Sequence, residues 1–490
     1  MASSHTDGNP ADTAIVWFRD DLRVADNPAL LAAAAHGNAV GLYVLDQESA
    51  GIRPLGGAAR WWLHHALEDL RAGLAGLGIP LILARGPAAL LVPEICDQVG
   101  ASAVFWNRRY GAVERVVDTV AKQRLQRADV QVESFQASLL HEPWRLATGA
   151  GTPYRVFTPF WKAASSLEIR YPLPTPAPGC GAPGRIPAGD ALDDLCLLPL
   201  GVDWAAGLRE HWSPSEGAGL SLLGAFIQDV LPDYATARER PDLHGSSRLS
   251  PYLRWGQLSP FQVWHALAGS RAGHPHDASV FASQLGWREF CWHQLFHNPD
   301  LAVANLRPVF NAYPWKWPDA SEPAAEGPDT RAHLAAWQQG MTGLPLVDAG
   351  QRELWHTGWM HNRVRMVSAS FLVKNLGIHW RLGEQWFWDT LVDADAASNP
   401  ANWQWVAGSG ADASPFFRIF NPETQAKKFD PEGRYTGAWV PEAGNPHYPE
   451  PLVDLKESRA LALDSYAGMK AATSSVAVSS PGRSPDSSPA

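Results

Sequence analysis

The sequence has few cysteines and no long apolar run. Its four cysteines, Cys96, Cys180, Cys196 and Cys291, are far apart among 490 residues and form no CxxC pair. A disulfide framework or a metal site built on cysteine is therefore not expected, and a reducing cytoplasm fits the composition. No apolar stretch approaches the roughly 18 residues that a membrane span requires. The first residues, MASSHTDGNPADTA, lack the basic and apolar regions of a signal peptide.

An excess of positive charge is also absent. The formal net charge is -10, which does not indicate a nucleic-acid-binding protein. It does not exclude one either, because phosphates respond to a local basic groove. No GxGxxG follows the first apolar run, where the sequence reads WFRDDLRVADNPAL instead. A Rossmann dinucleotide site is therefore unsupported.

Short apolar runs alternate with amphipathic segments over about the first 135 residues. We expect strands at residues 14–18, 40–45, 81–84, 103–106 and 130–132. Segments of helical periodicity, such as 58–77 and 112–127, lie between these runs. This alternation is typical of a doubly wound parallel sheet. From about Leu220 onward the pattern is helical, so the predicted fold is an α/β N-terminal domain followed by an all-helical domain.

Composition also suggests the domain boundaries. A segment dense in Pro and Gly, YPLPTPAPGCGAPGRIPAGD, predicts a linker. The last residues are rich in Ser and Pro, which is typical of disorder. The predicted division is a disordered N-terminus (1–13), an α/β domain (14–135), a linker (136–219), a helical domain (220–465) and a disordered tail (466–490).

Tryptophan is unusually abundant, with 23 residues against 17 Phe and 10 Tyr. Core filling explains most of them, but the stretch from Trp380 to Trp405 also contains Asp393, Asp395 and Asn399. Carboxylates with an amide can hold the polar edge of a flat heterocycle, and indoles are oxidisable. This stretch therefore suggests an enzyme that holds a redox-active ring.

Two further segments are compatible with a nucleotide ligand. GSSRLSPYL, at 245–253, offers hydroxyls, backbone amides and Arg248 at a loop-to-helix junction, which suits a diphosphate or a simple helix cap. In QLGWREF, Gln284, Trp287 and Arg288 share one helical face. That face could form the wall of a pocket for an aromatic ligand. Alternatively, Trp287 belongs to the core and Arg288 forms a surface ion pair with Glu289.

The segment WHTGWMHNRVRMVSASFLVK places Asn362 and Met366 on one helical face. A thioether beside an amide suits a flat base, although a capped helix with solvated arginines fits as well. Arg365 has candidate partners in Asp393 and Asp395, either beside a cofactor or as a structural salt bridge. In WQWVAGSGADASPFFRIFNPETQAKK, aromatic and basic residues fit a flipped base or a solvated surface.

Taken together and in order, these motifs resemble the photolyase/cryptochrome family over roughly residues 14–442. The quoted segments are IVWFRDDLRVADNPAL, GSSRLSPYLRWGQLSP, WREF, TGWMHNRVRM, WDTLVDADAASNPANWQW and FRIFNPETQAKKFDPEGRY. The most similar subgroup is the bacterial cyclobutane pyrimidine dimer photolyases of class I type. The resemblance implies a monomer that holds FAD in a helical domain and acts on UV-damaged DNA.

The resemblance also implies a role for individual residues. FAD would be held by Tyr234, Ser246, Ser247, Arg248, Leu249, Ser250, Gln284, Arg288, Trp359, Asn362, Arg365, Asp393, Ala394, Asp395 and Asn399. The flipped-out dimer and its DNA would contact Trp287, Asn362, Arg363, Met366 and Trp405. Electrons would reach the flavin through Trp380, Trp403 and Trp315, with Trp317 as the alternative surface end. Gln284 and Asn399 would act directly at the dimer and at flavin N5.

The implied reaction is the light-driven splitting of pyrimidine dimers with an electron supplied by reduced FAD. Gln284 departs from the family, because dimer photolyases have Glu there and 6-4 photolyases have Gln. His361–Asn362 departs from the paired histidines of the 6-4 enzymes. A cryptochrome-like photoreceptor is the main alternative, and a 6-4 photolyase is a third. Val113 leaves the antenna open between methenyltetrahydrofolate, a deazaflavin and none.

Overall fold

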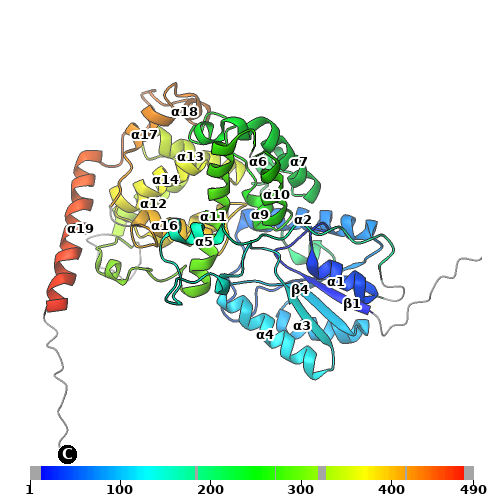
Figure 1. Ribbon diagram of the computed structural model, residues 1–490. Coiled ribbons are helices and arrows are strands. Elements are labelled where there is room, and N and C mark those ends of the chain that lie inside the picture. The colour runs from blue at the N-terminus through cyan, green and yellow to red at the C-terminus, as the bar shows by residue number, and fades with distance from the viewer. Residues whose placement is uncertain (1–12, 182–185, 271, 318–326, 414–416, 479–490) are drawn as a thin grey trace, which may run out of the picture. The chain divides into compact units, whose positions relative to one another are not determined.

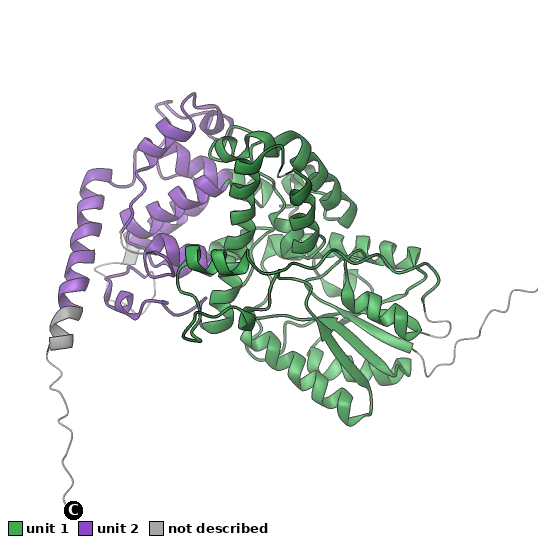
Figure 2. Ribbon diagram, in the orientation of Figure 1, with its two compact units in different colours: residues 1–299, 353–361, 385–399 green, residues 300–352, 362–384, 400–490 purple. Residues whose placement is uncertain are grey.

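The computed structural model describes residues 13–181, 186–270, 272–317, 327–413 and 417–478. The chain divides into two compact units, shown in green and purple in Figure 2. Unit 1 comprises residues 1–299, 353–361 and 385–399, and unit 2 comprises residues 300–352, 362–384 and 400–490. Three helices contribute residues to both units: α13 (Pro345–Thr357), α15 (Trp380–Thr390) and α16 (Ser398–Ala407).

Unit 1 begins with a parallel sheet of five strands in the order β3-β2-β1-β4-β5 (Figure 1). The strands are β1 (Thr13–Phe18), β2 (Asn38–Leu45), β3 (Leu81–Arg85), β4 (Ala103–Asn107) and β5 (Gln131–Phe135). In register, Ile15 of β1 lies between Val40 of β2 and Val104 of β4. All five strands were expected, and the predicted doubly wound sheet is confirmed.

Helices cover both faces of this sheet. They are α1 (Pro28–His36), α2 (Gly57–Gly76), α3 (Ala88–Val99) and α4 (Ala112–Arg127). Every residue of β1 is buried, and its side chains alternate between two hydrophobic clusters. Val16 and Phe18 pack in the cluster with α1 and α2, whereas Ile15 and Trp17 pack in the cluster with α3 and α4. This alternation is why the strand reads as a continuous apolar run.

The first of these clusters continues into the helical part of unit 1. Trp62 of α2 donates a hydrogen bond of 3.0 Å from Nε1 to Gln257 Oε1, and its ring meets those of Trp212 and Tyr252 edge-on. The helices of this part are α5 (Phe157–Ala164), α6 (Ala206–His211), α7 (Glu216–Ala225), α8 (Tyr234–Ala237), α9 (Ser250–Arg254), α10 (Pro260–Ser270) and α11 (Pro275–His297). One core therefore supports both the sheet and these helices.

Unit 2 is helical in its described residues. Besides its parts of α13, α15 and α16, its helices are α12 (Gly327–Gln339), α14 (Asn362–Ser370), α17 (Pro422–Phe429), α18 (Arg434–Trp439) and α19 (Leu455–Val478). A single π-helical turn, η7 (Phe371–Asn375), follows α14. Tyr466 of α19 stacks on Phe417 with ring centroids 4.3 Å apart and joins a small cluster around Phe310. The helical fold predicted for this part of the chain is confirmed.

The ends of the chain depart in part from the predicted boundaries. Helix α19 continues to Val478, so the disorder expected from residue 466 is wrong for residues 466–478. Residues 1–12 and 479–490, also expected to be disordered, lie outside the described residues. The predicted linker (136–219) contains α5 and α6, and the other boundaries stay predictions. Within the described ranges, no helix is long and apolar enough to cross a membrane.

Candidate functional site

The serine-rich segment of unit 1 leads into α9 and reaches a carboxylate far away in the sequence. Ser250 Oγ donates a hydrogen bond of 2.7 Å to Asp393 Oδ2, and Asp393 is buried. Arg248, two residues earlier, has a φ of 52°, a left-handed conformation that residues with a side chain rarely adopt. Two segments that the sequence analysis selected independently are thus joined at the start of α9.

The rest of the predicted phosphate-binding segment is partly accessible. Ser246 and Ser247 are half-buried, and Leu249 is buried. The Leu249 backbone N–H donates to Ser247 Oγ at 3.4 Å. Hydroxyls and backbone amides of this kind are the donors that commonly bind phosphate oxygens.

Arg254, at the end of α9, holds the same carboxylate segment through its backbone. Its Nε donates to the Ala394 carbonyl at 2.8 Å, and its Nη1 pairs with Asp20 Oδ1 at 2.7 Å. Burial lowers the pKa of Arg254, but the neighbouring Asp20 carboxylate outweighs burial and the net pKa is raised. The arginine therefore stays positively charged. Its two contacts connect Asp20, in the loop after β1, to the backbone of Ala394.

Asp395 caps helix α16. Its Oδ1 accepts hydrogen bonds from the backbone N–H groups of Ala397, at 2.8 Å, and Ser398, at 2.5 Å. A carboxylate in this position satisfies orphan donors and interacts favourably with the helix dipole. Asn399 lies in the first turn of α16 and is buried. The cap therefore fixes the first turn of α16, and with it the position of the Asn399 backbone.

Helix α11 positions two of the predicted pocket residues. Gln284 and Trp287 lie one turn apart and are both half-buried. Gln284 Oε1 accepts a hydrogen bond of 3.0 Å from Arg238 Nη2. Trp287 stacks on Phe157 of α5 at a centroid distance of 3.8 Å and an interplanar angle of 8°. One face of the indole is therefore covered by Phe157.

The next residues of α11 form an ion pair. Arg288 Nη1 lies 3.1 Å from Glu289 Oε1, and Glu289 is buried, so the alternative of a surface pair is wrong. The Leu140 backbone N–H donates to Glu289 Oε2 at 2.8 Å. Burial raises the pKa of Glu289 to about 7, although Arg288 and backbone hydrogen bonds oppose the shift.

Aromatic rings surround the other predicted residues of unit 1. The Arg248 guanidinium lies 4.5 Å from the Trp212 ring centroid and 5.2 Å from that of Trp359. Tyr234 is buried and meets Phe281 edge-on. Burial raises the pKa of the Tyr234 hydroxyl, so this hydroxyl is neutral near pH 7.

In unit 2, Trp380 is fully buried at the start of α15. Its Nε1 donates to Asn305 Oδ1 at 2.9 Å, and its ring lies 5.6 Å from that of His379. Trp315 and Trp317 also contact His379, at centroid distances of 5.3 Å and 4.8 Å. Both candidates for the surface end of the electron-transfer chain therefore meet the same imidazole.

The two tryptophans of α16 in unit 2 have different surroundings. Trp403 is buried and meets Trp337 edge-on at 6.1 Å. Trp405 is half-buried, with the Arg418 guanidinium 5.2 Å from its ring centroid. The expected proximity of an aromatic and a basic side chain is thus present at Trp405.

Helix α14 of unit 2 carries the predicted base-contacting residues. Asn362 Nδ2 lies 3.9 Å from Met366 Sδ, so these side chains share one face, as their spacing suggests. The Arg363 guanidinium lies 4.3 Å from the Phe429 ring centroid, and Arg365 is half-buried.

The chemistry of the unit 1 residues fits the flavin nucleotide that the resemblance implies. The buried carboxylates of Asp393 and Asp395 and the buried amide of Asn399 suit the polar edge of a heterocycle, and the serine segment suits a diphosphate. All predicted flavin residues belong to unit 1 except Asn362 and Arg365. The predicted electron-transfer tryptophans belong to unit 2, with Met366 and Trp405.

Three contacting residues escaped the sequence analysis. Arg238 binds Gln284, Arg254 binds the Ala394 carbonyl, and His379 lies against Trp380. The contacts of Arg238 and Arg254 join residues 46 and 140 positions apart, which residue type alone does not reveal. Arg254 does lie within the quoted motif GSSRLSPYLRWGQLSP, which was the available signal.

Two family models match this chain. Residues 14–179 match the model of DNA photolyase, and residues 281–446 match the FAD-binding domain of DNA photolyase. Together they cover the parallel sheet and most of the helical region that follows α11.

Whole-length relatives agree with the family models. The deoxyribodipyrimidine photo-lyase of Agrobacterium fabrum is 45% identical over 94% of this chain and 98% of its own. Cryptochrome-1 of Arabidopsis thaliana is 36% identical over 90% of this chain and 64% of its own. A crystal structure described as a bacterial class III photolyase from Agrobacterium tumefaciens superposes with a TM-score of 0.88 and 43% identity, covering 96% of this chain and all of that one.

Proposed function

The chain belongs to the DNA photolyase family, and from this premise we propose that it is a light-driven repair enzyme that splits cyclobutane pyrimidine dimers in DNA. The observation that carries the proposal is the 45% identity, over nearly the full length of both chains, to a deoxyribodipyrimidine photo-lyase. Relatives of the same name in Synechococcus and Escherichia coli, at 35% and 34% identity, support it.

We propose that this protein belongs to class III of the photolyases rather than to the class I type that its motifs resemble. The class III structure from Agrobacterium tumefaciens is 43% identical to this chain. A cryptochrome structure from Synechocystis is 27% identical. We therefore assign the protein to class III.

The residues of unit 1 have proposed roles in holding the cofactor. FAD, when bound, supplies the electron that light makes available. Asp393, Asp395 and Asn399 orient the heterocycle, and the segment that ends at Ser250 binds the diphosphate. Gln284 offers its amide to the dimer while Arg238 holds its carbonyl oxygen at 3.0 Å.

The residues of unit 2 have proposed roles in electron supply and in DNA contact. Trp380, Trp403 and Trp315 carry electrons towards the cofactor. Met366 and Trp405 are proposed to pack against the bases of the dimer. A damaged site is already weakly paired and stacked, so its bases leave the duplex at reduced cost.

A cryptochrome-type photoreceptor is the second candidate function. The 36% identity to cryptochrome-1 of Arabidopsis and the amide of Gln284 in place of a carboxyl favour it. A photoreceptor binds FAD and responds to blue light without repairing DNA. Repair activity therefore separates the two candidates.

The test is blue-light repair of thymine-dimer DNA by the purified protein, with its flavin reduced chemically. We expect light-dependent loss of dimers and no loss in the dark. Parallel samples with 6-4 photoproducts should remain unrepaired. If FAD is bound and photoreducible but thymine dimers persist, the proposal is rejected in favour of a photoreceptor, or of a 6-4 enzyme where that lesion disappears.

The remaining properties are proposed on chemical grounds. All four cysteines are free in the described residues, which supports a reducing cytoplasm. We also propose that the protein acts as a monomer.

A second chromophore is part of the proposal, with methenyltetrahydrofolate and a deazaflavin as the choices. An archaeal photolyase from Sulfolobus tokodaii, 26% identical, was solved with two FAD molecules.

A further inference from the structure

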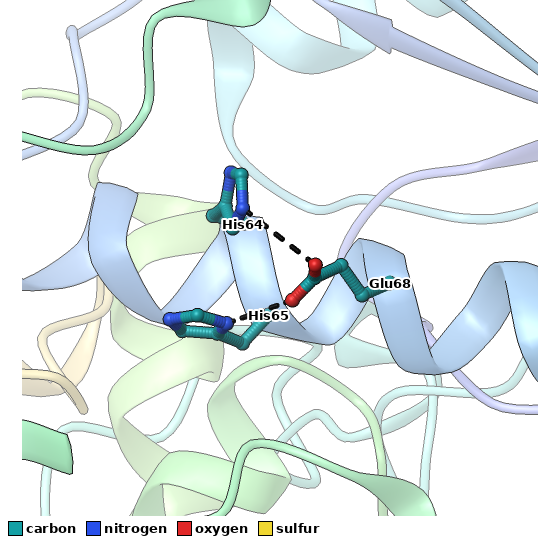
Figure 3. A group of neighbouring side chains, drawn as sticks. All are labelled: His64, His65 and Glu68. Atoms are coloured by element: carbon teal, nitrogen blue, oxygen red, sulfur yellow. Dashed lines mark hydrogen bonds and ion pairs between the residues drawn. The ribbon is translucent and has the colours of Figure 1, made fainter. Parts of the chain in front are cut away.

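One turn of α2 gathers three potential metal ligands that the proposed function does not use. They are His64, His65 and Glu68 (Figure 3). One ligand atom from each residue lies within 4.8 Å of the other two. Figure 3 shows the Glu68 carboxylate joined by dashed lines to both imidazole rings. The three side chains therefore converge on one point beside the helix.

Helix geometry explains the convergence. Successive residues are about 100° apart around the axis, so Glu68 projects between the directions of His64 and His65, one turn further along. His65 Nδ1 lies 2.8 Å from Glu68 Oε2, and His64 Nε2 lies 3.9 Å from Glu68 Oε1. Two ligands of a tetrahedral zinc ion are roughly 3.4 Å apart, given metal–ligand distances near 2.1 Å. The two observed distances bracket this value.

His64 is the buried member of the group. It is only 5% exposed, and its Nδ1 has no hydrogen-bond partner among the described residues. The other ring nitrogen, Nε2, faces Glu68, so Nε2 is the atom of His64 that would bind the ion.

We propose that His64, His65 and Glu68 form a binding site for a divalent transition-metal ion, with Zn²⁺ as the ion that fits best. Two imidazoles and one carboxylate are a known zinc ligand set, and they leave the remaining coordination positions to water. Because all three ligands lie on one turn of an existing helix, little backbone rearrangement is needed for binding.

The test is calorimetric titration of the untagged, FAD-loaded full chain with Zn²⁺ after treatment with a chelator. We expect one ion per chain, with a dissociation constant below about 10 μM, and a higher melting temperature in the presence of zinc. His65→Gln and Glu68→Gln should each weaken binding at least about tenfold. Both should also abolish the thermal shift.

Two controls make the result specific. Glu210, His211 and His356 form a second, exposed group of potential ligands, so His356→Gln should leave the affinity unchanged. Cys196 is an exposed thiol, so Cys196→Ser should also leave it unchanged. Circular dichroism and flavin absorbance report whether each variant is folded. Absence of zinc binding, unchanged binding by the folded Glu68→Gln protein, or loss of binding in either control overturns the proposal.

Discussion

At the scale of single residues, Gln284 raises the sharpest question about repair. Its carbonyl oxygen accepts a hydrogen bond from Arg238 Nη2 at 3.0 Å. We expect Gln284→Glu to raise the quantum yield of dimer repair, because a protonated carboxyl group can donate a proton as well as a hydrogen bond to the negatively charged dimer, which an amide cannot do. The measurement is repair per absorbed photon in the chemically reduced protein.

The matched control for this prediction is Gln98→Glu, which makes the same change on the surface of α3. That variant should repair at the wild-type yield. An unchanged or lower yield for Gln284→Glu would mean that the pocket works best with the neutral amide.

Trp380 tests the proposed electron supply. We expect Trp380→Phe to slow photoreduction of oxidised flavin by at least about tenfold, because phenylalanine cannot replace an oxidisable indole. Repair by the chemically reduced variant should be unaffected. Flash photolysis measures the first property and dimer loss the second, with Trp144→Phe, at a half-exposed indole of unit 1, as the control. Normal photoreduction would remove Trp380 from the chain.

Glu289 makes stability depend on pH. Its folded-state pKa of about 7 lies above the ordinary value of 4.5, so the folded protein binds this proton more tightly than the unfolded chain does. The resulting stabilisation is complete below pH 4.5 and is lost as the pH rises through 7. Its full size is about 3 kcal/mol.

Comparison with Glu289→Gln isolates this effect. The stability of wild type relative to the variant should fall as the pH rises from 5 to about 8, because the amide does not ionise. Thermal melts of both proteins across this range measure it, and Glu94→Gln, at an exposed position of α3, reports the effect of removing a surface charge. A constant difference between wild type and Glu289→Gln would mean that Glu289 is ionised in the folded state at all these pH values.

At the scale of elements, the packing of α15 depends on Gly383. A Cβ at this position would lie 2.1 Å from Trp403 Cη2 and 2.7 Å from Leu372 Cδ2. We expect Gly383→Ala to destabilise the protein by about 1–3 kcal/mol, because the buried indole has to move. Thermal or urea unfolding measures the change.

Gly468 of α19 provides the contrasting element. A Cβ there would meet no heavy atom within 4 Å. Gly468→Ala should therefore stabilise the helix by about 0.5–1 kcal/mol, the usual advantage of alanine over glycine. Equal effects of the two substitutions would contradict the packing described for α15.

At the scale of the whole molecule, the net charge of -10 has to be reconciled with DNA as the proposed partner. Binding then has to rely on local basic residues rather than on total charge. We expect the affinity for dimer-containing duplex to fall with rising salt, since each neutralised phosphate contributes roughly -0.9 to the log–log slope. Fluorescence anisotropy at several salt concentrations measures this slope, and a value near zero would exclude binding through phosphates.

Much of the architecture was predictable from the sequence because it depends on local periodicity. Most strands of the sheet are short apolar runs, as expected for strands buried on both faces. The helices α2 and α4 have apolar residues at helical spacing, as expected for helices with one buried face. The family motifs are also local, so the resemblance predicts the FAD-binding region from the sequence alone. The order of the strands is the one that the doubly wound pattern allows most readily.

The local sequence pattern did not predict the structure at two places where tertiary packing outweighs composition. The Ser- and Pro-rich end predicted disorder from residue 466, but Tyr466 stacks on Phe417 and α19 continues to Val478. Similarly, the pair of Arg288 and Glu289 gives no sign of burial in sequence. Tertiary contacts override intrinsic preference in both cases.

By itself, the sequence determined the fold class, the family and the residue types available to the site, because each of these depends on patterns within short segments of the chain. Only the tertiary structure decided which of those residues meet. Ser250 and Asp393 are 143 positions apart and share a hydrogen bond, and Arg254 joins Asp20 to the Ala394 carbonyl. Such contacts depend on the path of the whole chain, because the gain from packing a common core has to exceed the entropy lost in closing long loops.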